Sequence, residues 1–283
     1  MKTELNKSAT IKDSEVTLFR NMSTILSSKY HVTFVGETHQ QYVTYHSPQI
    51  GREATREISD IWIIAFSPSK KLARMTFLQA KYHRGILDTI NRTFDGEYFQ
   101  YELLSTRPNL IKVSGRRFNF PLNILSLGCC NSVGSYGIFY IDGKKQIDMA
   151  YSSAHEVHLL SKLPHSYASY KVKLDIPFFP LPVAPRKCKC GTCEETVASF
   201  DLDEFIHYLL DLKIGVELTI APQHFSFIRS VLAQQQPSLA IGQFLDFVDN
   251  FGTANIIDQE FIFEGLPTNL MVINTDPKED VRE

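Results

Sequence analysis

An aspartate, a glutamine and a lysine stand at the ends of two neighbouring apolar segments early in the chain. Asp60 precedes the run Ile61-Trp62-Ile63-Ile64-Ala65-Phe66, and Gln79-Ala80-Lys81 follows Met75-Thr76-Phe77-Leu78. Successive side chains of a strand point to opposite faces, so Gln79 and Lys81 share one face. A carboxylate, an amide oxygen and an ammonium group gathered at one sheet edge could hold a divalent cation and a phosphate group.

Hydrolysis of a phosphodiester bond is the chemistry that such a group would serve. It needs a hydroxide formed at neutral pH and neutralisation of the charge that develops on the phosphate. Mg²⁺ or Mn²⁺ supplies both when carboxylate and carbonyl oxygens hold it. We expect Asp60 to be the essential ligand, with the Ala80 backbone carbonyl and the Gln79 side chain completing the protein's share. Lys81 would orient the attacking water or stabilise the charge of the transition state.

The two apolar segments are predicted to form a β-hairpin that brings these groups together. The connection Ser67-Pro68-Ser69-Lys70-Lys71 has the proline, serine and charge typical of a turn. A helix is predicted before the hairpin, because apolar residues recur at helical spacing and Ser14 or Asp13 can cap its start. The pattern also predicts a strand from His31 to Gly36 and a helix from Ile86 to Leu104.

This arrangement resembles the PD-(D/E)XK nuclease superfamily, and within it the Mrr-like restriction endonucleases that carry glutamine in place of the second acidic residue. Asp60 matches the hairpin aspartate, Gln79 the variant position and Lys81 the lysine, whereas Ser59 stands where the pattern often has proline. The resemblance covers about a third of the chain, from Glu15 to Leu104. It implies an α/β (α+β) fold with a restriction-endonuclease-like mixed sheet flanked by helices, and Mg²⁺-dependent cleavage of DNA.

The resemblance also implies one more acidic residue, on the helix before the hairpin. Glu15 is the candidate at that place. Glu37 competes with it, because the predicted strand from His31 to Gly36 would deliver Glu37 into a loop near the sheet edge. Both glutamates remain open as the additional metal ligand.

Charge is distributed unevenly along the chain, although the formal net charge is only −2. Residues 1–192 carry 25 Lys and Arg against 15 Asp and Glu, whereas residues 193–283 carry 4 against 16. The basic part contains the hairpin and could line a groove for a nucleic-acid backbone. The acidic part suits a protein partner, or a cover for that groove, better than DNA. The residues expected to contact DNA are Lys70, Lys71, Arg74, Arg84, Arg116 and Arg117.

A second specific signal is the segment Cys188-Lys189-Cys190-Gly191-Thr192-Cys193, which holds three of the five cysteines. Such a cluster, with a glycine that permits a tight turn, indicates a structural zinc site built from thiolates. Cys129 or Cys130 would supply the fourth ligand. Free thiols, a redox pair and a disulfide are the alternatives, and a disulfide is disfavoured in a reducing compartment.

Length and composition indicate a globular protein of one large or two smaller domains, with 283 residues and 43% hydrophobic content. We expect a nuclease-like core with a β-rich extension in residues 1–176. Residues 177–283 would form a region with the cysteine cluster and acidic helices, packed as one unit with the core or separate from it. No apolar run suits a membrane span and the start lacks a secretory signal, so a cytoplasmic protein is expected.

The middle of the chain is predicted to be rich in strands and loops, with a hairpin turn at Asp142-Gly143. The C-terminal third is predicted to be helical, with a last strand from Leu270 to Asn274.

Together these patterns predict a metal-dependent DNA endonuclease of restriction or anti-phage defence, with a homo-oligomer among its possible states. Two other classes stay open. One is a subunit of a defence complex that keeps the nuclease fold and binds nucleic acid or protein without cleavage, which the glutamine at position 79 favours. The other is a structural zinc protein whose acidic region docks a partner.

Overall fold

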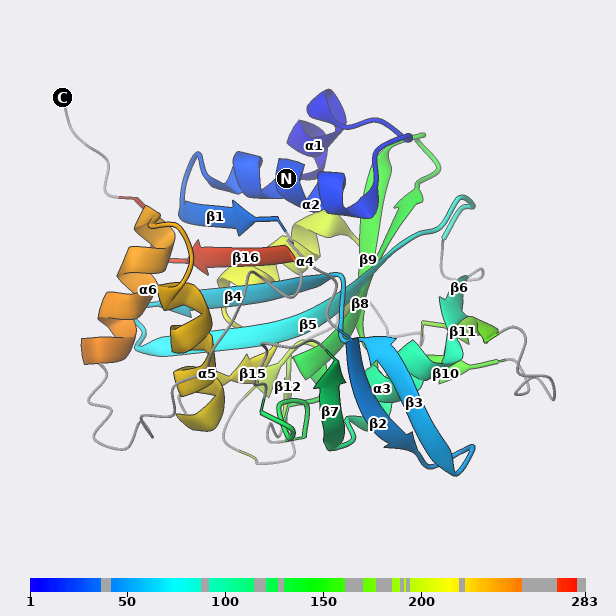
Figure 1. Cartoon of the computed structure of the whole chain (residues 1–283). Helices are drawn as coiled ribbons and strands as arrows, with labels where there is room; N and C mark the ends of the chain where they lie inside the picture. Colours follow the sequence, from blue (N-terminus) through cyan, green and yellow to red (C-terminus); the bar gives the residue numbers. More distant parts are fainter. Residues whose placement is uncertain are drawn as a thin grey trace.

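The computed structural model shows a mixed α+β protein organised around one central sheet (Figure 1). The structure describes residues 1–36, 42–87, 92–114, 121–126, 130–160, 170–176, 185–188, 191, 194–218, 222–250 and 269–278. Among these residues, no helix is long and apolar enough to cross a membrane.

The central sheet has the strand order β1-β16-β4-β5-β8-β9-β14, and the short strand β15 also pairs with β5. Two pairings, β16 with β4 and β5 with β8, are parallel, and the others are antiparallel, so the sheet is mixed. Its strands are β1 (His31–Val35), β4 (Ile61–Ser67), β5 (Leu72–Tyr82), β8 (Gly134–Ile141), β9 (Ile147–Ser153), β14 (Ala198–Ser199), β15 (Val216–Glu217) and β16 (Asn269–Asn274).

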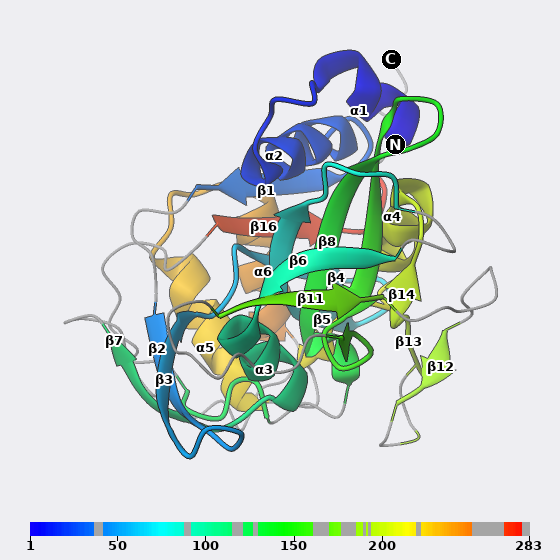
Figure 2. The ribbon, with the colours of Figure 1, turned by 90° about the vertical axis from the view of Figure 1, so that its right-hand side faces the viewer.

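Three smaller sheets have the strand orders β3-β2-β7, β10-β11-β6 and β12-β13. Figure 2 shows β3-β2-β7 at the end of the molecule opposite to α1 and α2. The strands are β2 (Tyr42–Ser47), β3 (Arg52–Glu57), β6 (Thr93–Glu97), β7 (Leu110–Ser114), β10 (His158–Leu159), β11 (Lys171–Asp175), β12 (Arg186–Lys187) and β13 (Glu194–Glu195). The helices are α1 (Lys2–Ser8), α2 (Glu15–Leu26), α3 (Tyr98–Thr106), α4 (Leu202–Leu210), α5 (Pro222–Ala233) and α6 (Leu239–Asn250), and Asn131–Val133 form a 3₁₀ turn.

Two cores cover the two faces of the central sheet, because alternate side chains of a strand point to opposite faces. Trp62, Ile64 and Phe66 of β4 belong to the core that includes side chains of α3, α5 and α6. Ile61 and Ile63 belong to the other core, which includes side chains of α1, α2 and α4. The fully apolar β4 sequence is thus explained by burial on both faces.

Most elements predicted from the sequence are present. The hairpin of β4 and β5, helix α2 with Ser14 as its N-cap, strand β1, the turn at Asp142 and the last strand are confirmed. The helix predicted from Ile86 to Leu104 is wrong in its described first part. Thr93–Glu97 form strand β6 instead, because this segment pairs with β11, far away in the sequence.

The boundary expected near residue 177 does not separate two sheets. Strands β14, β15 and β16, all from the C-terminal region, pair with β9, β5 and β4 of the N-terminal region. Residues on both sides of position 177 therefore contribute strands to one sheet.

Candidate functional site

The hairpin places Asp60 opposite Gln79, as the sequence pattern predicts. Ile61 pairs with Leu78 across β4 and β5, so the next positions outward are Asp60 and Gln79. The Asp60 carboxylate is half-buried, and its Oδ2 accepts hydrogen bonds from the Ala80 backbone N–H at 2.8 Å and from the Gln79 side-chain Nε2. Its Oδ1 accepts no hydrogen bond within the described part of the chain.

The backbone of Asp60 is fixed by a neighbouring strand. Asn269, the first residue of β16, donates from its side-chain Nδ2 to the Asp60 carbonyl oxygen at 3.0 Å. Because β16 pairs with β4 in parallel register, this amide lies beside the start of β4. The carboxylate is therefore held at a defined place by two strands that are distant in the sequence.

Gln79 is almost completely buried and takes part in a chain of amides. Its exposed fraction is 2%, and its Oε1 accepts a hydrogen bond from the side-chain Nε2 of Gln100 in α3. Gln100 is itself only 6% exposed. Gln100 is not among the residues predicted from the sequence. The signal that could have found it is a polar side chain within the apolar helix Tyr98–Thr106, of which most side chains are buried.

Burial raises the pKa of the Asp60 carboxyl above its ordinary value. The positive charge of Lys81, the Ala80 N–H and the Gln79 amide oppose this rise, and the negative charge of Glu15 adds slightly to it. As a net effect, the ionised form of Asp60 is less stable than in water, and a further positive charge close to it would stabilise this form.

Lys81 lies near this carboxylate without contacting it. It follows Gln79 by two residues in β5, so both side chains leave the same face of the strand. Lys81 is half-buried and makes no hydrogen bond or ion pair with any other described residue. Its ammonium group therefore remains available to a further anionic or polar group at this edge.

The two glutamates proposed as an additional ligand have different outcomes. Glu15 is the first residue of α2 and is close enough to affect the Asp60 pKa, although no contact joins the two carboxyl groups. Glu37 lies outside the described residues.

The oxygen atoms at this edge fit a Mg²⁺ ion that keeps most of its water ligands. Asp60 Oδ1 accepts no hydrogen bond from any described residue, and the Ala80 carbonyl lies on the Asp60 side of β5, because the N–H and C=O of one strand residue point to the same side. Gln79 turns its amino group, not its oxygen, to Asp60, so its expected role as an oxygen ligand requires the amide to rotate. No group of three or more His, Cys, Asp or Glu side chains that could hold a metal occurs in the described ranges.

A cavity of 660 Å³ opens between the start of α2 and the end of β5, on the face of the sheet that α2 covers. Arg84 and Tyr82 line it from the hairpin side, and Lys12, Asp13 and Glu15 from the helix side. Of the residues predicted to contact DNA, Arg84 thus lines this cavity, to which Asp60, Gln79 and Lys81 do not contribute.

The other predicted DNA contacts are elsewhere. Arg74 is a wrong prediction, because its side chain is 3% exposed and donates to the Gly215 carbonyl oxygen at 3.1 Å. Gly215 permits this approach, since its φ is +93° and an added Cβ would lie 2.4 Å from the Met75 carbonyl oxygen. Lys70 and Lys71 occupy the hairpin turn, roughly 20 Å from Asp60 at about 3.3 Å per strand residue. Arg116 and Arg117 lie outside the described residues.

The cysteine cluster is described only in part. The Gly191 N–H donates to the Cys188 carbonyl oxygen at 2.9 Å with φ of +75°, which is the expected tight turn. Cys188 is disulfide-bonded, and the fully buried Cys130 packs against it. A disulfide sulfur does not bind zinc, so a zinc site at Cys188 would require the reduced form and stays a prediction. Cys129, Cys190 and Cys193 lie outside the described residues.

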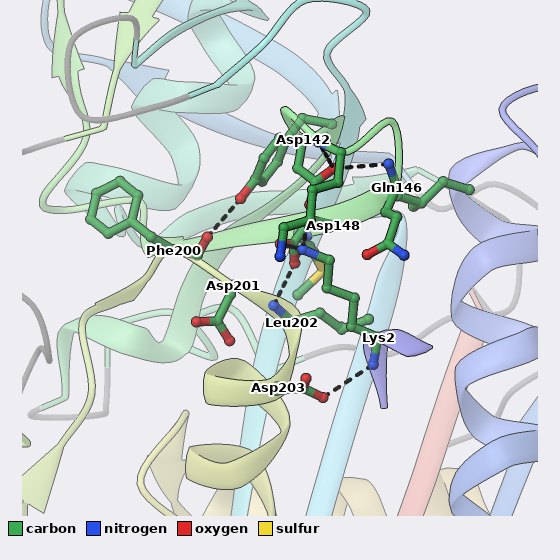
Figure 3. Close-up of polar contacts among 12 residues, drawn as sticks. Lys2, Asp142, Gln146, Asp148, Phe200, Asp201, Leu202 and Asp203 are labelled. Carbon is green, nitrogen blue, oxygen red and sulfur yellow. Dashed lines mark hydrogen bonds and ion pairs between the residues drawn. The ribbon is translucent and has the colours of Figure 1, made fainter. Parts of the chain in front are cut away.

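A second group of carboxylates lies between α1, α4 and the β8–β9 hairpin (Figure 3). The Lys2 ammonium contacts the carboxylates of Asp142, at 2.7 Å, and Asp148, and Asp148 Oδ1 accepts from the Leu202 N–H at 2.8 Å. Asp203 pairs with the amino group of Met1 at 2.8 Å. Since the chain's own amino groups occupy these carboxylates, the cluster joins α1 to the sheet and is not a candidate cation site.

Comparison with known proteins adds no relative. No family model matches this chain, and no curated protein or solved structure matches it either. Function must therefore be argued from the arrangement around Asp60.

Proposed function

We propose that this protein is a metal-dependent endonuclease that hydrolyses phosphodiester bonds of DNA, acting in restriction or anti-phage defence. The observation that carries the proposal is the pairing of Asp60 with Gln79 at the end of the hairpin, with Lys81 on the same strand face. The resemblance to PD-(D/E)XK nucleases of the Mrr-like branch rests on these three residues. A mixed sheet flanked by helices is compatible with a restriction-endonuclease-like fold.

Each side chain has a definable task in this reaction. Asp60 Oδ1 and the Ala80 carbonyl would hold Mg²⁺ or Mn²⁺, which supplies a hydroxide at neutral pH and charge neutralisation when bound. Lys81 would donate to the attacking water or to a non-bridging phosphate oxygen, because its ammonium group has no partner among the described residues. Arg84, three residues after Lys81, would bind a neighbouring phosphate.

Burial supports this assignment through the pKa of Asp60. An ionised carboxylate that is costly in the free protein gains most from a divalent cation, because the cation replaces the missing charge compensation. Cation binding and ionisation of Asp60 are therefore expected to be coupled, with tighter binding as the pH rises.

The test is cleavage of supercoiled plasmid and of single-stranded DNA with Mg²⁺, Mn²⁺ or EDTA. We expect nicking with either metal, none with EDTA, and a loss of at least about a hundredfold in Asp60→Ala and Lys81→Ala. Lys70→Ala is the matched control, since it removes a hairpin lysine from the opposite end. Nicking that survives in both site variants would contradict the proposal.

One observation favours the alternative of a non-cleaving, nucleic-acid-binding protein of the same fold. The Gln79 amino group faces Asp60, and no second carboxylate contacts Asp60 in the described part of the molecule. Tight DNA binding by the wild-type protein, with no nicking in Mg²⁺ or Mn²⁺, would support this alternative over the nuclease.

A further inference from the structure

Gln100 is a buried amide behind the candidate site, and the proposed cleavage chemistry does not use it. Its Nε2 donates to Gln79 Oε1, and Gln79 Nε2 in turn donates to Asp60 Oδ2. The three side chains come from α3, β5 and the start of β4. They form one chain of hydrogen bonds in which every donor points towards Asp60.

The direction of this chain decides whether Gln79 can bind a cation, because a primary amide has one donor end and one acceptor end. In the direction observed, the Gln79 oxygen is bound to Gln100 and faces away from Asp60. Rotation of both amides by about 180° would let Gln79 Nε2 donate to Gln100 Oε1. The Gln79 oxygen would then lie beside the Asp60 carboxylate, which is unfavourable alone and favourable with a cation between them.

A buried hydroxyl group belongs to the strand that pairs with the Gln79 segment of β5. Tyr136 is the register partner of Gln79 in β8, and its side chain is fully buried. Its hydroxyl group has no hydrogen-bond partner among the described residues. Buried hydroxyl groups are normally paired, so this group on the neighbouring strand remains open to a further hydrogen bond.

We propose that Gln100 is a positioning residue that sets the direction of the Gln79 amide, and that both amides reverse when a divalent cation binds at Asp60. This inference rests on the proposed metal-dependent function. The glutamine at position 79 then acts as a conditional ligand, whose oxygen is presented only in the cation-bound state.

Gln100→Glu tests the proposal because a carboxylate can only accept hydrogen bonds. It must accept from Gln79 Nε2 and thereby turns the Gln79 oxygen towards Asp60. We expect Mn²⁺ affinity, measured by calorimetry on the full chain, to rise about tenfold, as for other directly coupled residues. The gain should fade at acid pH, where the introduced carboxyl group is protonated and can donate as the amide does.

The Gln79→Met variant serves as a control that separates the effect of the Gln79 amide orientation from the effect of the added negative charge. In Gln79→Met, the change Gln100→Glu contributes only its negative charge, so we expect a rise in Mn²⁺ affinity of less than about twofold. Equal gains in the two backgrounds would overturn the proposal. Wild-type protein that shows no Asp60-dependent Mn²⁺ binding would instead contradict the proposed function itself.

A second measurement does not depend on the folding of any Gln100 variant. In wild-type protein labelled with ¹⁵N, addition of diamagnetic Mg²⁺ should shift the side-chain amide resonances of both Gln79 and Gln100. Neither should shift in Asp60→Ala. A shift of Gln79 without one of Gln100 would overturn the coupled reversal.

Discussion

Asp60 and Asp148 are two buried or half-buried carboxylates at the same sheet, and burial raises the pKa of both. Their hydrogen bonding differs. Asp148 uses both oxygens, one on the Lys2 ammonium and the other on the backbone N–H groups of Leu202 and Met149 (Figure 3). Within the described part of the chain Asp60 accepts hydrogen bonds on one oxygen only, and the charge of Lys81 acts on it without contact.

The comparison teaches that a raised pKa does not identify a functional carboxylate by itself. Asp148 is committed to joining α1, α4 and β9, so its charge is already compensated by the chain. Among the described residues, Asp60 has an oxygen without a hydrogen bond and the nearby Lys81 has an ammonium group without a partner, which is the condition for binding something else. The following predictions distinguish the two carboxylates. They compare variants of Asp60 and Asp148 first in DNA cleavage and then in stability.

The largest expected difference is in DNA cleavage. Asp60→Asn keeps the shape of the side chain but removes its charge, and should lower metal-dependent nicking at least about a hundredfold. In Asp148→Asn, the nicking rate of the folded fraction should stay within about threefold of the wild-type rate, since Asp148 contacts none of the candidate site residues. Equal losses in the two variants would remove the distinction between the carboxylates.

The next difference is in stability. Asp148→Ala leaves the Leu202 N–H and part of the Lys2 charge without a partner, so the free energy of unfolding should fall by about 3 kcal/mol. Chemical denaturation with urea measures this change. The control Glu4→Ala removes the exposed ion pair with Lys7 on α1 and should change the free energy by less than about 1 kcal/mol. A loss as small in Asp148→Ala would show that this cluster does not anchor α1.

Cation binding should stabilise the protein through Asp60 alone. Mg²⁺ at ten times its dissociation constant should raise the free energy of unfolding of the wild type by about 1.4 kcal/mol. No rise is expected in Asp60→Asn, whereas Asp148→Asn should respond as the wild type does. Thermal unfolding with and without Mg²⁺ provides the measurement, and a rise that persists in Asp60→Asn would place the cation elsewhere.

The pH dependence of stability should show a smaller effect, whose direction follows from the raised pKa of Asp60. The folded-state pKa of Asp60 lies above its unfolded value of 3.8, so the folded state holds the proton more strongly. Stability is therefore lost as the pH rises from about 4 through the folded-state pKa. The metal-free Asp60→Asn variant lacks this loss, and its advantage over the wild type in unfolding temperature should grow from pH 4 to pH 7. A constant or shrinking difference would mean that burial does not penalise the charge.

The smallest effect is expected at the far end of the same hairpin. Lys70 pairs with Asp211 at 3.0 Å on an exposed surface, so Lys70→Ala should change stability by less than about 1 kcal/mol. DNA affinity, measured by fluorescence anisotropy, should stay within about twofold, whereas Arg84→Ala should weaken it and reduce its salt dependence. A larger loss of DNA affinity in Lys70→Ala would mean that the DNA also contacts the hairpin turn.

Local patterns in the sequence were sufficient for the hairpin and for the meeting of Asp60 with Gln79. Two apolar runs joined by a turn fix the strand register, and the register places these residues opposite each other. The helix before the hairpin was predictable for the same reason, since its cap and apolar spacing are local. These features need no information from distant parts of the chain.

Contacts between distant segments explain what the sequence did not predict. Arg74 is buried because its guanidinium binds the Gly215 carbonyl, and β6 is a strand because it pairs with β11. The hydrogen bond of Gln100 to Gln79 depends on where α3 lies relative to β5, which no local spacing encodes. The secondary-structure propensity of a segment cannot decide such cases, because the stabilising contacts come from segments that are distant in the sequence.

The position of β16 has a consequence for how the protein is made. This strand is synthesised after every other strand of the described fold, yet it lies between β1 and β4, and its Asn269 side chain anchors Asp60. A growing chain on the ribosome folds from its N-terminal side as it emerges. Until β16 emerges, β1 lacks the strand with which it pairs in the described sheet, and the Asp60 carbonyl lacks the Asn269 side chain. The pairing of Asp60 with Gln79 is local to the hairpin and can form earlier, whereas the anchoring of Asp60 to a second strand must wait for β16.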